Sequence, residues 1–229
     1  MATVLTLSGS PSADSRSTFL VSTVAARLHD LGIDTRSLDV RDIPAHDLLH
    51  ARFDSPAIVD LVNEVQRADA IVIGTPIYKA AYSGVLKALL DVLPQTAFHD
   101  KLILPVATGG SAAHFLAVDY ALKPVLSALG ARHILSTLFA TEAQLVRNAD
   151  RGYVFADEVR TRLDDAVEQL TQGVVGKARH AGNGRSNFRG SIPGNVSGNA
   201  AGNVHNNIAG KLGSAGPLEH LRTRAAAGV

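Results

Sequence analysis

The sequence predicts an α/β fold in which helices cover both faces of a parallel sheet. Strand-like and helix-like segments alternate five times between residues 2 and 173. Parallel strands need crossover connections, and right-handed crossovers place helices on both faces of the sheet. With 229 residues, of which 46% are hydrophobic, the chain is long enough for one domain with a sizeable core.

The first half of this alternation holds three strands and two helices. The β-branched run at 2–8 predicts a strand, and 17–32 predicts a helix because its apolar residues follow helical spacing and end at a glycine. A second strand is expected at 34–40. Residues 55–68 predict a helix that begins with a serine cap followed by proline. The apolar run at 68–74 then reads as a buried third strand.

The second half continues the same pattern. An apolar stripe predicts a helix that begins near Ser83, and the apolar run at 101–109 predicts the fourth strand. A long helix is expected at 111–130, and a fifth strand is expected around 133–140. A final amphipathic helix is expected near 155–173. The sequence therefore predicts one α/β domain that spans residues 1–175.

The remainder of the chain, residues 176–229, has a different composition. It contains 11 of the 20 glycines and repeats Gly-Asn, and its seven basic residues and one acidic residue leave 15 basic and 20 acidic residues for the domain. Such a segment buries too little apolar surface to offset chain entropy, so we expect a disordered basic tail. A small solenoid and a nucleic-acid arm are the alternatives. The dilute charge and single aromatic residue disfavour nucleic acid as a partner.

The composition indicates the cellular compartment of the protein and excludes some kinds of covalent link and metal site. The chain has no cysteine, which excludes disulfides and thiolate metal sites and fits a reducing compartment. We find no secretory leader pattern and no apolar run of roughly 18 residues. A cytoplasmic protein without a membrane partner is the expectation.

In an open parallel sheet, ligands bind beyond the carboxyl ends of the strands. The loop after the first strand, 8–17, lacks both G-x-G-x-x-G and G-x-x-x-x-G-K-[ST]. It offers five serine hydroxyls, the guanidinium of Arg16 and the free amides of a helix N-terminus, which together suit a single phosphate monoester. The alternative is that a serine merely caps the helix, which would explain one of the five serines.

The loops after the third and fourth strands offer groups for a flat ring. In 75–84, Pro76 stiffens the turn, Lys79 supplies a cation, and Tyr78 and Tyr82 present aromatic faces. The alternative for the tyrosines is packing against helices or another subunit. In 107–114, two adjacent glycines allow a close approach of the backbone to a ligand. A phosphate grip combined with a flat-ring grip describes FMN better than a dinucleotide.

One short motif resembles a zinc site. "HDLLH" places His46 and His50 four residues apart, with Asp47 after the first histidine. Aspartate is shorter than the glutamate of H-E-x-x-H, Pro44 leaves little helix before the motif, and no third ligand is evident. No metal site is therefore expected.

Four stretches together resemble the NAD(P)H-dependent FMN reductases that serve two-component alkanesulfonate monooxygenases. They are "TLSGSPSADSRS", "HDLLHARFDSPAI", "GTPIYKAAYSGVLKALLDVLP" and "LPVATGGSAAHFLAVDYALKPVLSALGA". The likeness runs from about residue 2 to 173. It implies a flavodoxin-like three-layer fold with strand order 2-1-3-4-5, and reduction of FMN by NADPH or NADH. It also implies a homo-oligomer, dimer or tetramer, that releases reduced flavin to an FMNH2-dependent monooxygenase in sulfur acquisition.

The resemblance also assigns site residues. The residues that it places at the phosphate are Ser8, Ser10, Ser15, Arg16 and Ser17. Those that it places around the isoalloxazine are Pro76, Ile77, Tyr78 and Lys79 on one side and Thr108, Gly109, Gly110 and Ser111 on the other. One departure is Ser12, which stands where relatives often carry arginine, and this weakens the expected grip on the phosphate.

The expected catalytic residues are Lys79 and Tyr120. Lys79 is expected to stabilise negative charge near the reduced ring. The resemblance implies that Tyr120 lies on a π-bulge at the oligomer interface and reaches a neighbouring subunit's flavin site. The alternative is a plain helix with Tyr120 packed in an interface. Because the cofactor carries hydride transfer, no acid–base set is required. A flavin-retaining quinone or azo reductase and an FMN-binding electron carrier remain alternative functions.

Overall fold

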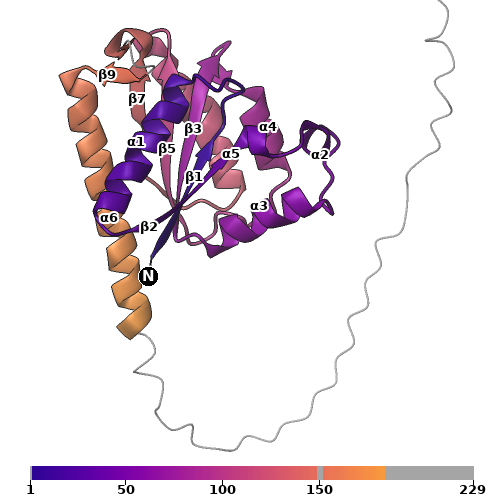
Figure 1. The fold of residues 1–229 in the computed structure, drawn as a ribbon. Helices are drawn as coiled ribbons and strands as arrows, with labels where there is room; N and C mark the ends of the chain where they lie inside the picture. The colour runs from indigo at the N-terminus through magenta and orange to yellow at the C-terminus, as the bar shows by residue number, and fades with distance from the viewer. Residues whose placement is uncertain (1, 149–151, 184–229) are drawn as a thin grey trace, which may run out of the picture. The chain divides into compact units, whose positions relative to one another are not determined.

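The computed structural model describes residues 2–148 and 152–183, and its centre is a parallel sheet in the order β2-β1-β3-β5-β6 (Figure 1). β7 lies on the same side of β5 as β6, and it too pairs in parallel with β5. The strands of this sheet are β1 (Thr3–Ser8), β2 (Asp34–Asp39), β3 (Ala70–Tyr78), β5 (Leu102–Gly109), β6 (His133–Ile134) and β7 (Leu138–Thr141). The predicted order 2-1-3-4-5 is confirmed.

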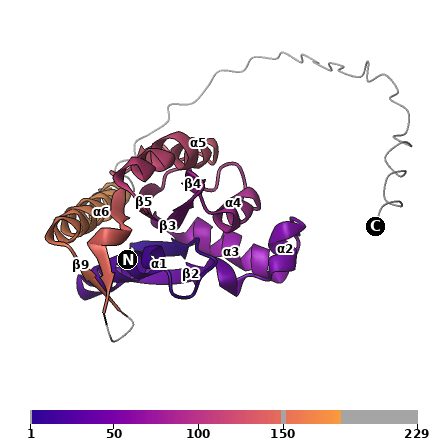
Figure 2. The same ribbon diagram turned by 90° about the horizontal axis from the view of Figure 1, so that it is seen from above.

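Helices cover both faces of the sheet, which gives the three layers (Figure 2). α1 and α6 pack on one face, and the remaining helices pack on the other. The helices are α1 (Arg16–Asp30), α2 (Ala45–Leu49), α3 (Pro56–Arg67), α4 (Gly84–Asp91), α5 (Lys123–Ala128) and α6 (Asp157–Asn183). The predicted α/β class is therefore confirmed.

Each strand contributes to two hydrophobic cores because successive side chains point to opposite faces. In β3, Ile71 and Ile73 join the core beneath α3 and α4, whereas Ala70 and Val72 join the core beneath α1 and α6. All four of these β3 side chains are fully buried. This two-sided burial explains why the strands read as continuous apolar runs rather than as alternating ones.

Serine caps begin three of the helices. Ser15, Ser55 and Ser83 each have extended backbone and accept a hydrogen bond from an amide in the first turn of α1, α3 and α4. Such caps satisfy amides that have no partner within the helix. The predicted starts of α3 and α4 are confirmed.

Several predicted boundaries were wrong. The fifth strand is split into β6 and β7, with a break at residues 135–137. The third strand continues to Tyr78 because β4 (Ala81–Tyr82) folds back on it in an antiparallel hairpin. The long helix predicted at 111–130 is three pieces, and α6 continues to Asn183, beyond the boundary expected at residue 175. The expectation for the tail from residue 184 onward lies outside the described residues.

The pieces of the expected long helix differ in their winding. A 3₁₀ turn, η2, covers Ala112–Phe115, and a π-helix, η3, covers Val118–Leu122 before α5 begins. Short 3₁₀ turns also occur as η1 (Val40–Asp42) and η4 (Glu142–Gln144), and a second hairpin joins β8 (Leu145–Arg147) to β9 (Tyr153–Phe155). Within residues 2–148 and 152–183, no helix has the length and apolar character that a membrane span requires.

Candidate functional site

The sheet registers bring the ends of three strands to one edge. Ser8 of β1 lies opposite Gly74 of β3, and Pro76 of β3 lies opposite Thr108 of β5. A cavity of about 140 Å³ opens there. Its lining residues are Ser10, Ser12, Asp14, Ser15, Arg16, Pro76, Ile77, Tyr78, Thr108, Gly109 and Glu142.

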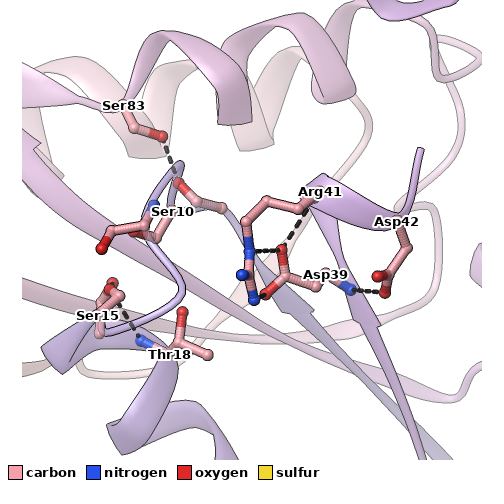
Figure 3. Close-up of polar contacts among 10 residues, drawn as sticks. Ser10, Ser15, Thr18, Asp39, Arg41, Asp42 and Ser83 are labelled. Carbon is pink, nitrogen blue, oxygen red and sulfur yellow. Dashed lines mark hydrogen bonds and ion pairs between the residues drawn. The ribbon is translucent and has the colours of Figure 1, made fainter. Parts of the chain in front are cut away.

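The loop after β1 forms one wall of this cavity and ends at the N-terminus of α1. Ser15 caps α1 by accepting a hydrogen bond from the Thr18 amide at 3.3 Å (Figure 3). The hydroxyls of Ser15 and Ser17 lie 2.9 Å apart, and the Ser10 hydroxyl accepts a hydrogen bond from the Ser12 amide at 3.2 Å. The helix dipole and free first-turn amides favour an anion at this position.

Strand β3 and the N-cap of α4 hold the first loop in place. Gly9 donates its amide to the Gly74 carbonyl at 2.8 Å. The buried Ser83 hydroxyl donates to the Gly9 carbonyl. The Ser83 amide donates in turn to the Thr75 hydroxyl at 3.0 Å. Ser83 therefore caps α4 and also connects β3 to the loop after β1.

The β3–β4 hairpin presents the residues expected at the flavin ring. Its two central residues, Lys79 and Ala80, have φ of +51° and +60°, which matches the left-handed conformation that two-residue hairpin turns require. Tyr78 is half exposed beside the cavity, and Lys79 is exposed at the tip. Tyr82 packs against the core, and desolvation by burial raises the pKa of its hydroxyl.

The end of β5 and the turn after it pack closely against His114. A Cβ on Gly109 would lie 2.7 Å from the Cβ of His114, so only glycine fits there without a shift. The neighbouring Gly110 donates its amide to Nδ1 of His114 at 3.1 Å. The imidazole of His114 thus holds this turn, and Thr108 and Gly109 line the cavity.

The π-helix η3 carries Tyr120. This side chain is 81% exposed, and the nearby Leu116 is 54% exposed. An ion pair between Lys123 and Asp119, at 2.6 Å, spans the junction of η3 and α5. The expected π-helical irregularity is present, whereas the plain helix considered as its alternative is wrong.

The structure brings most of the predicted site residues to one place. Eight of them line the cavity: Ser10, Ser15, Arg16, Pro76, Ile77, Tyr78, Thr108 and Gly109. Ser8 and Ser17 are buried behind the wall, because β1 pairing encloses the first and α1 packing encloses the second. Lys79, Gly110, Ser111 and Tyr120 lie outside the lining and are exposed.

Sequence reasoning missed the β8–β9 hairpin and its contacts with the first loop. Arg147 of β8 forms an ion pair with Asp14 at 2.8 Å, and Asp14 raises the pKa of that guanidinium. Arg16 lies 3.7 Å from the carboxylate of Glu142 and packs over the ring of Tyr153. The available signal was the pair of short β-branched and aromatic segments on either side of residues 148–152.

The histidine pair lies elsewhere. His46 and His50 are on and just after the short helix α2, with ring centroids 4.7 Å apart, and His46 Nδ1 lies 3.4 Å from Asp47. Among the residues that the structure describes, no group of three or more metal-binding side chains comes together.

The donor set of the cavity fits FMN. Hydroxyls, one guanidinium and a helix N-terminus suit a phosphate monoester, and these groups come from the loop after β1. Tyr78 at the end of β3 and Thr108 and Gly109 at the end of β5 border the same cavity and suit a planar ring. Groups that suit a phosphate and groups that suit a planar ring therefore line one cavity.

Comparisons with known proteins agree with this fit. Residues 2–145 match the family described as NADPH-dependent FMN reductase. The chain is 47% identical over 171 residues to FMN reductase (NADPH) of Escherichia coli K12, covering 75% of this chain and 89% of the relative. It is 44% identical over 187 residues to FMN reductase (NADPH) of Pseudomonas putida KT2440, and the match covers 81% of this chain and 95% of that relative.

A solved structure agrees as well. The apo crystal structure of the NADH:FMN oxidoreductase EMOB superposes with a TM-score of 0.69 at 34% identity, covering 76% of this chain and 90% of that one. The chain belongs to the NADPH-dependent FMN reductase family, and it is an oxidoreductase that reduces FMN with NAD(P)H.

Proposed function

We propose that FMN is an exchangeable substrate of this enzyme and that the reduced flavin leaves for an FMNH2-dependent monooxygenase. The supporting observation is the small size of the cavity at the carboxyl edge, about 140 Å³. Sites that enclose a ligand commonly measure roughly 300–1,000 Å³. Tyr78 is half exposed and Lys79 is exposed beside this small cavity, so the proposal is that a bound flavin keeps one ring face open, where a nicotinamide can stack and from which the flavin can depart.

The proposed roles of the residues follow from their positions. Ser10, Ser15 and Arg16 contact the phosphate, and Ser8 and Ser17 hold that wall from behind. Pro76, Ile77 and Tyr78 border one side of the ring. Thr108, Gly109, Gly110 and Ser111 border the other side, with Gly110 and Ser111 at its exposed margin. The flavin supplies the hydride chemistry, so the protein contributes position and charge, including the Lys79 ammonium.

The proposal also covers the partner and the assembly. Alkanesulfonate desulfonation in sulfur acquisition is the proposed use of the reduced flavin, in the cytoplasm, which the cysteine-free composition fits. A homo-oligomer, dimer or tetramer, is proposed to form around η3, because the exposed Tyr120 and Leu116 offer apolar surface there. Tyr120 then reaches the flavin site of a neighbouring subunit.

The testing experiment follows reduced-nicotinamide absorbance in air, with NADPH or NADH, with and without added FMN. Turnover that requires free FMN and rises with its concentration supports the proposal. Turnover that ignores added FMN but responds to a quinone or azo dye would make the protein a flavin-retaining reductase. FMN binding without any nicotinamide oxidation would indicate an electron carrier.

A second arm tests the partner. Enzyme, FMN and NADPH are combined with an FMNH2-dependent alkanesulfonate monooxygenase and an alkanesulfonate, and sulfite release is measured. Sulfite that depends on the reductase supports delivery of reduced flavin. FMN reduction at full rate without sulfite would contradict the proposed partner while leaving the reductase activity intact.

A further inference from the structure

The residues that line the phosphate end of the cavity include more acidic than basic side chains. Its lining includes the carboxylates of Asp14 and Glu142 and the single guanidinium of Arg16. A phosphate monoester carries between one and two negative charges near neutral pH. Two carboxylates on the wall of a phosphate site repel the phosphate and so weaken its binding.

Each carboxylate is paired with an arginine. Arg147 contacts Asp14 at 2.8 Å, and Arg16 lies 3.7 Å from Glu142 while its Nε donates to the Leu145 carbonyl at 3.5 Å. Both guanidiniums also lie over the ring of Tyr153, at 5.7 Å for Arg16 and 5.9 Å for Arg147. The two pairs therefore form one cluster beside the N-terminus of α1.

The β8–β9 hairpin does not need these pairs to stay against α1. The Phe19 ring of α1 packs on Tyr153 at 5.1 Å and on Phe155 at 5.5 Å. The Tyr153 hydroxyl also donates to the Asp14 carbonyl at 3.4 Å. Since aromatic packing already attaches the hairpin, the two exposed carboxylates are available for another role.

We propose that Asp14 and Glu142 set the affinity of this enzyme for the flavin phosphate and keep it low enough for exchange. Glu142 competes with the phosphate for Arg16. Asp14 repels the phosphate, and Arg147 masks part of that charge. This inference rests on the proposed release of flavin, because a reductase that retains its flavin gains nothing from acids at the phosphate.

The test measures dissociation constants for FMN and for riboflavin by flavin fluorescence, without nicotinamide. Riboflavin has the same ring but no phosphate, so it separates the phosphate effect from all other effects. Glu142→Gln and Asp14→Asn should each tighten FMN binding about three- to tenfold and leave riboflavin unchanged. The gain should shrink at high salt, because screening weakens interactions between exposed charges.

A matched control removes the same charge elsewhere. Asp164→Asn breaks an exposed 2.6 Å ion pair with Arg27 near the other end of α1, and FMN affinity should not change. An equal change in FMN and riboflavin affinity for Glu142→Gln or Asp14→Asn would contradict the proposal. Unchanged or weaker FMN binding in these variants would also overturn it.

The role of Arg147 is tested by a double-variant cycle. Arg147→Ala alone should weaken FMN binding severalfold, because it unmasks Asp14. In the Asp14→Asn background the same change should have a smaller effect. Equal effects in both backgrounds would show that Arg147 acts independently of Asp14. These affinities do not involve the monooxygenase, so a failure to deliver reduced flavin would leave the cycle interpretable.

Discussion

At the residue scale, Gly74 shows how closely the sheet and α1 approach behind the site. An added Cβ would lie 2.2 Å from Cγ2 of Val21, which is buried in α1. The Gly74 carbonyl also accepts the Gly9 amide that orients the first ligand loop. A β-branched side chain such as valine has little rotamer freedom in a helix, so this contact cannot relax easily.

We expect Gly74→Ala to destabilise the protein by about 2 kcal/mol through overpacking. Urea unfolding measures the change. The Val21→Ala background removes the clashing methyl group and should relieve at least half of that cost, although Val21→Ala is itself destabilising. Equal costs of Gly74→Ala in both backgrounds would locate the strain somewhere other than Val21.

Lys79 carries an exposed charge at the tip of the β3–β4 hairpin. If its ammonium stabilises the developing charge on the ring, Lys79→Ala should slow single-turnover flavin reduction about tenfold, or about 1.4 kcal/mol. Lys79→Arg keeps the charge and should retain most of the rate. An unchanged single-turnover rate in Lys79→Ala would remove the lysine from the reaction.

At the element scale, the β3–β4 hairpin stores backbone strain beside the site. Its turn places two residues with Cβ atoms, Lys79 and Ala80, at positive φ, where most hairpins of this length use asparagine or glycine. Strain of this kind persists where the surrounding structure enforces it. Here β4 pairing and the Ser83 hydrogen bonds hold both ends of the turn.

Ala80→Gly should therefore stabilise the protein by about 0.5–1 kcal/mol, since relief of the left-handed strain exceeds the added chain entropy. Thermal unfolding at fixed pH measures the change. Ala81→Gly is the matched control, because Ala81 lies in β4, outside the left-handed region, and should lose stability. A loss of stability in Ala80→Gly would contradict the proposal that the turn at Lys79 and Ala80 is strained.

At the scale of the whole molecule, apolar surface gathers on η2 and η3. Tyr120 and Leu116 are more than half exposed on this part of the chain, which follows directly on the third ligand loop. π-Helical turns are rare and occur often at functional sites. This combination places the proposed subunit contact next to the proposed flavin site.

Tyr120→Ala should lower the molar mass of the assembly measured by light scattering after gel filtration at a fixed protein concentration. Leu31→Ala is the control, because Leu31 is 59% exposed at the end of α1, away from η3. An unchanged molar mass in Tyr120→Ala would contradict an interface centred on this residue.

The amino-acid sequence by itself determined the class of the fold, the strand order that its family likeness implies, and most of the cavity. Apolar runs and helical stripes are local patterns, and they reflect which faces are buried. Serine caps are local too, and they placed the starts of α3 and α4 correctly. Strand ends meet at one edge of a parallel sheet, so the three ligand loops could be found from order alone.

Tertiary structure alone decided the features that depend on contacts between distant segments. The break between β6 and β7 and the pairing of β4 with β3 depend on neighbours rather than on local pattern. Arg147 and Asp14 are far apart in the chain, and no periodicity relates them. The pairing of Arg147 with Asp14 is therefore visible only once the β8–β9 hairpin has packed against α1, because electrostatic interactions depend on distance in space and not in sequence.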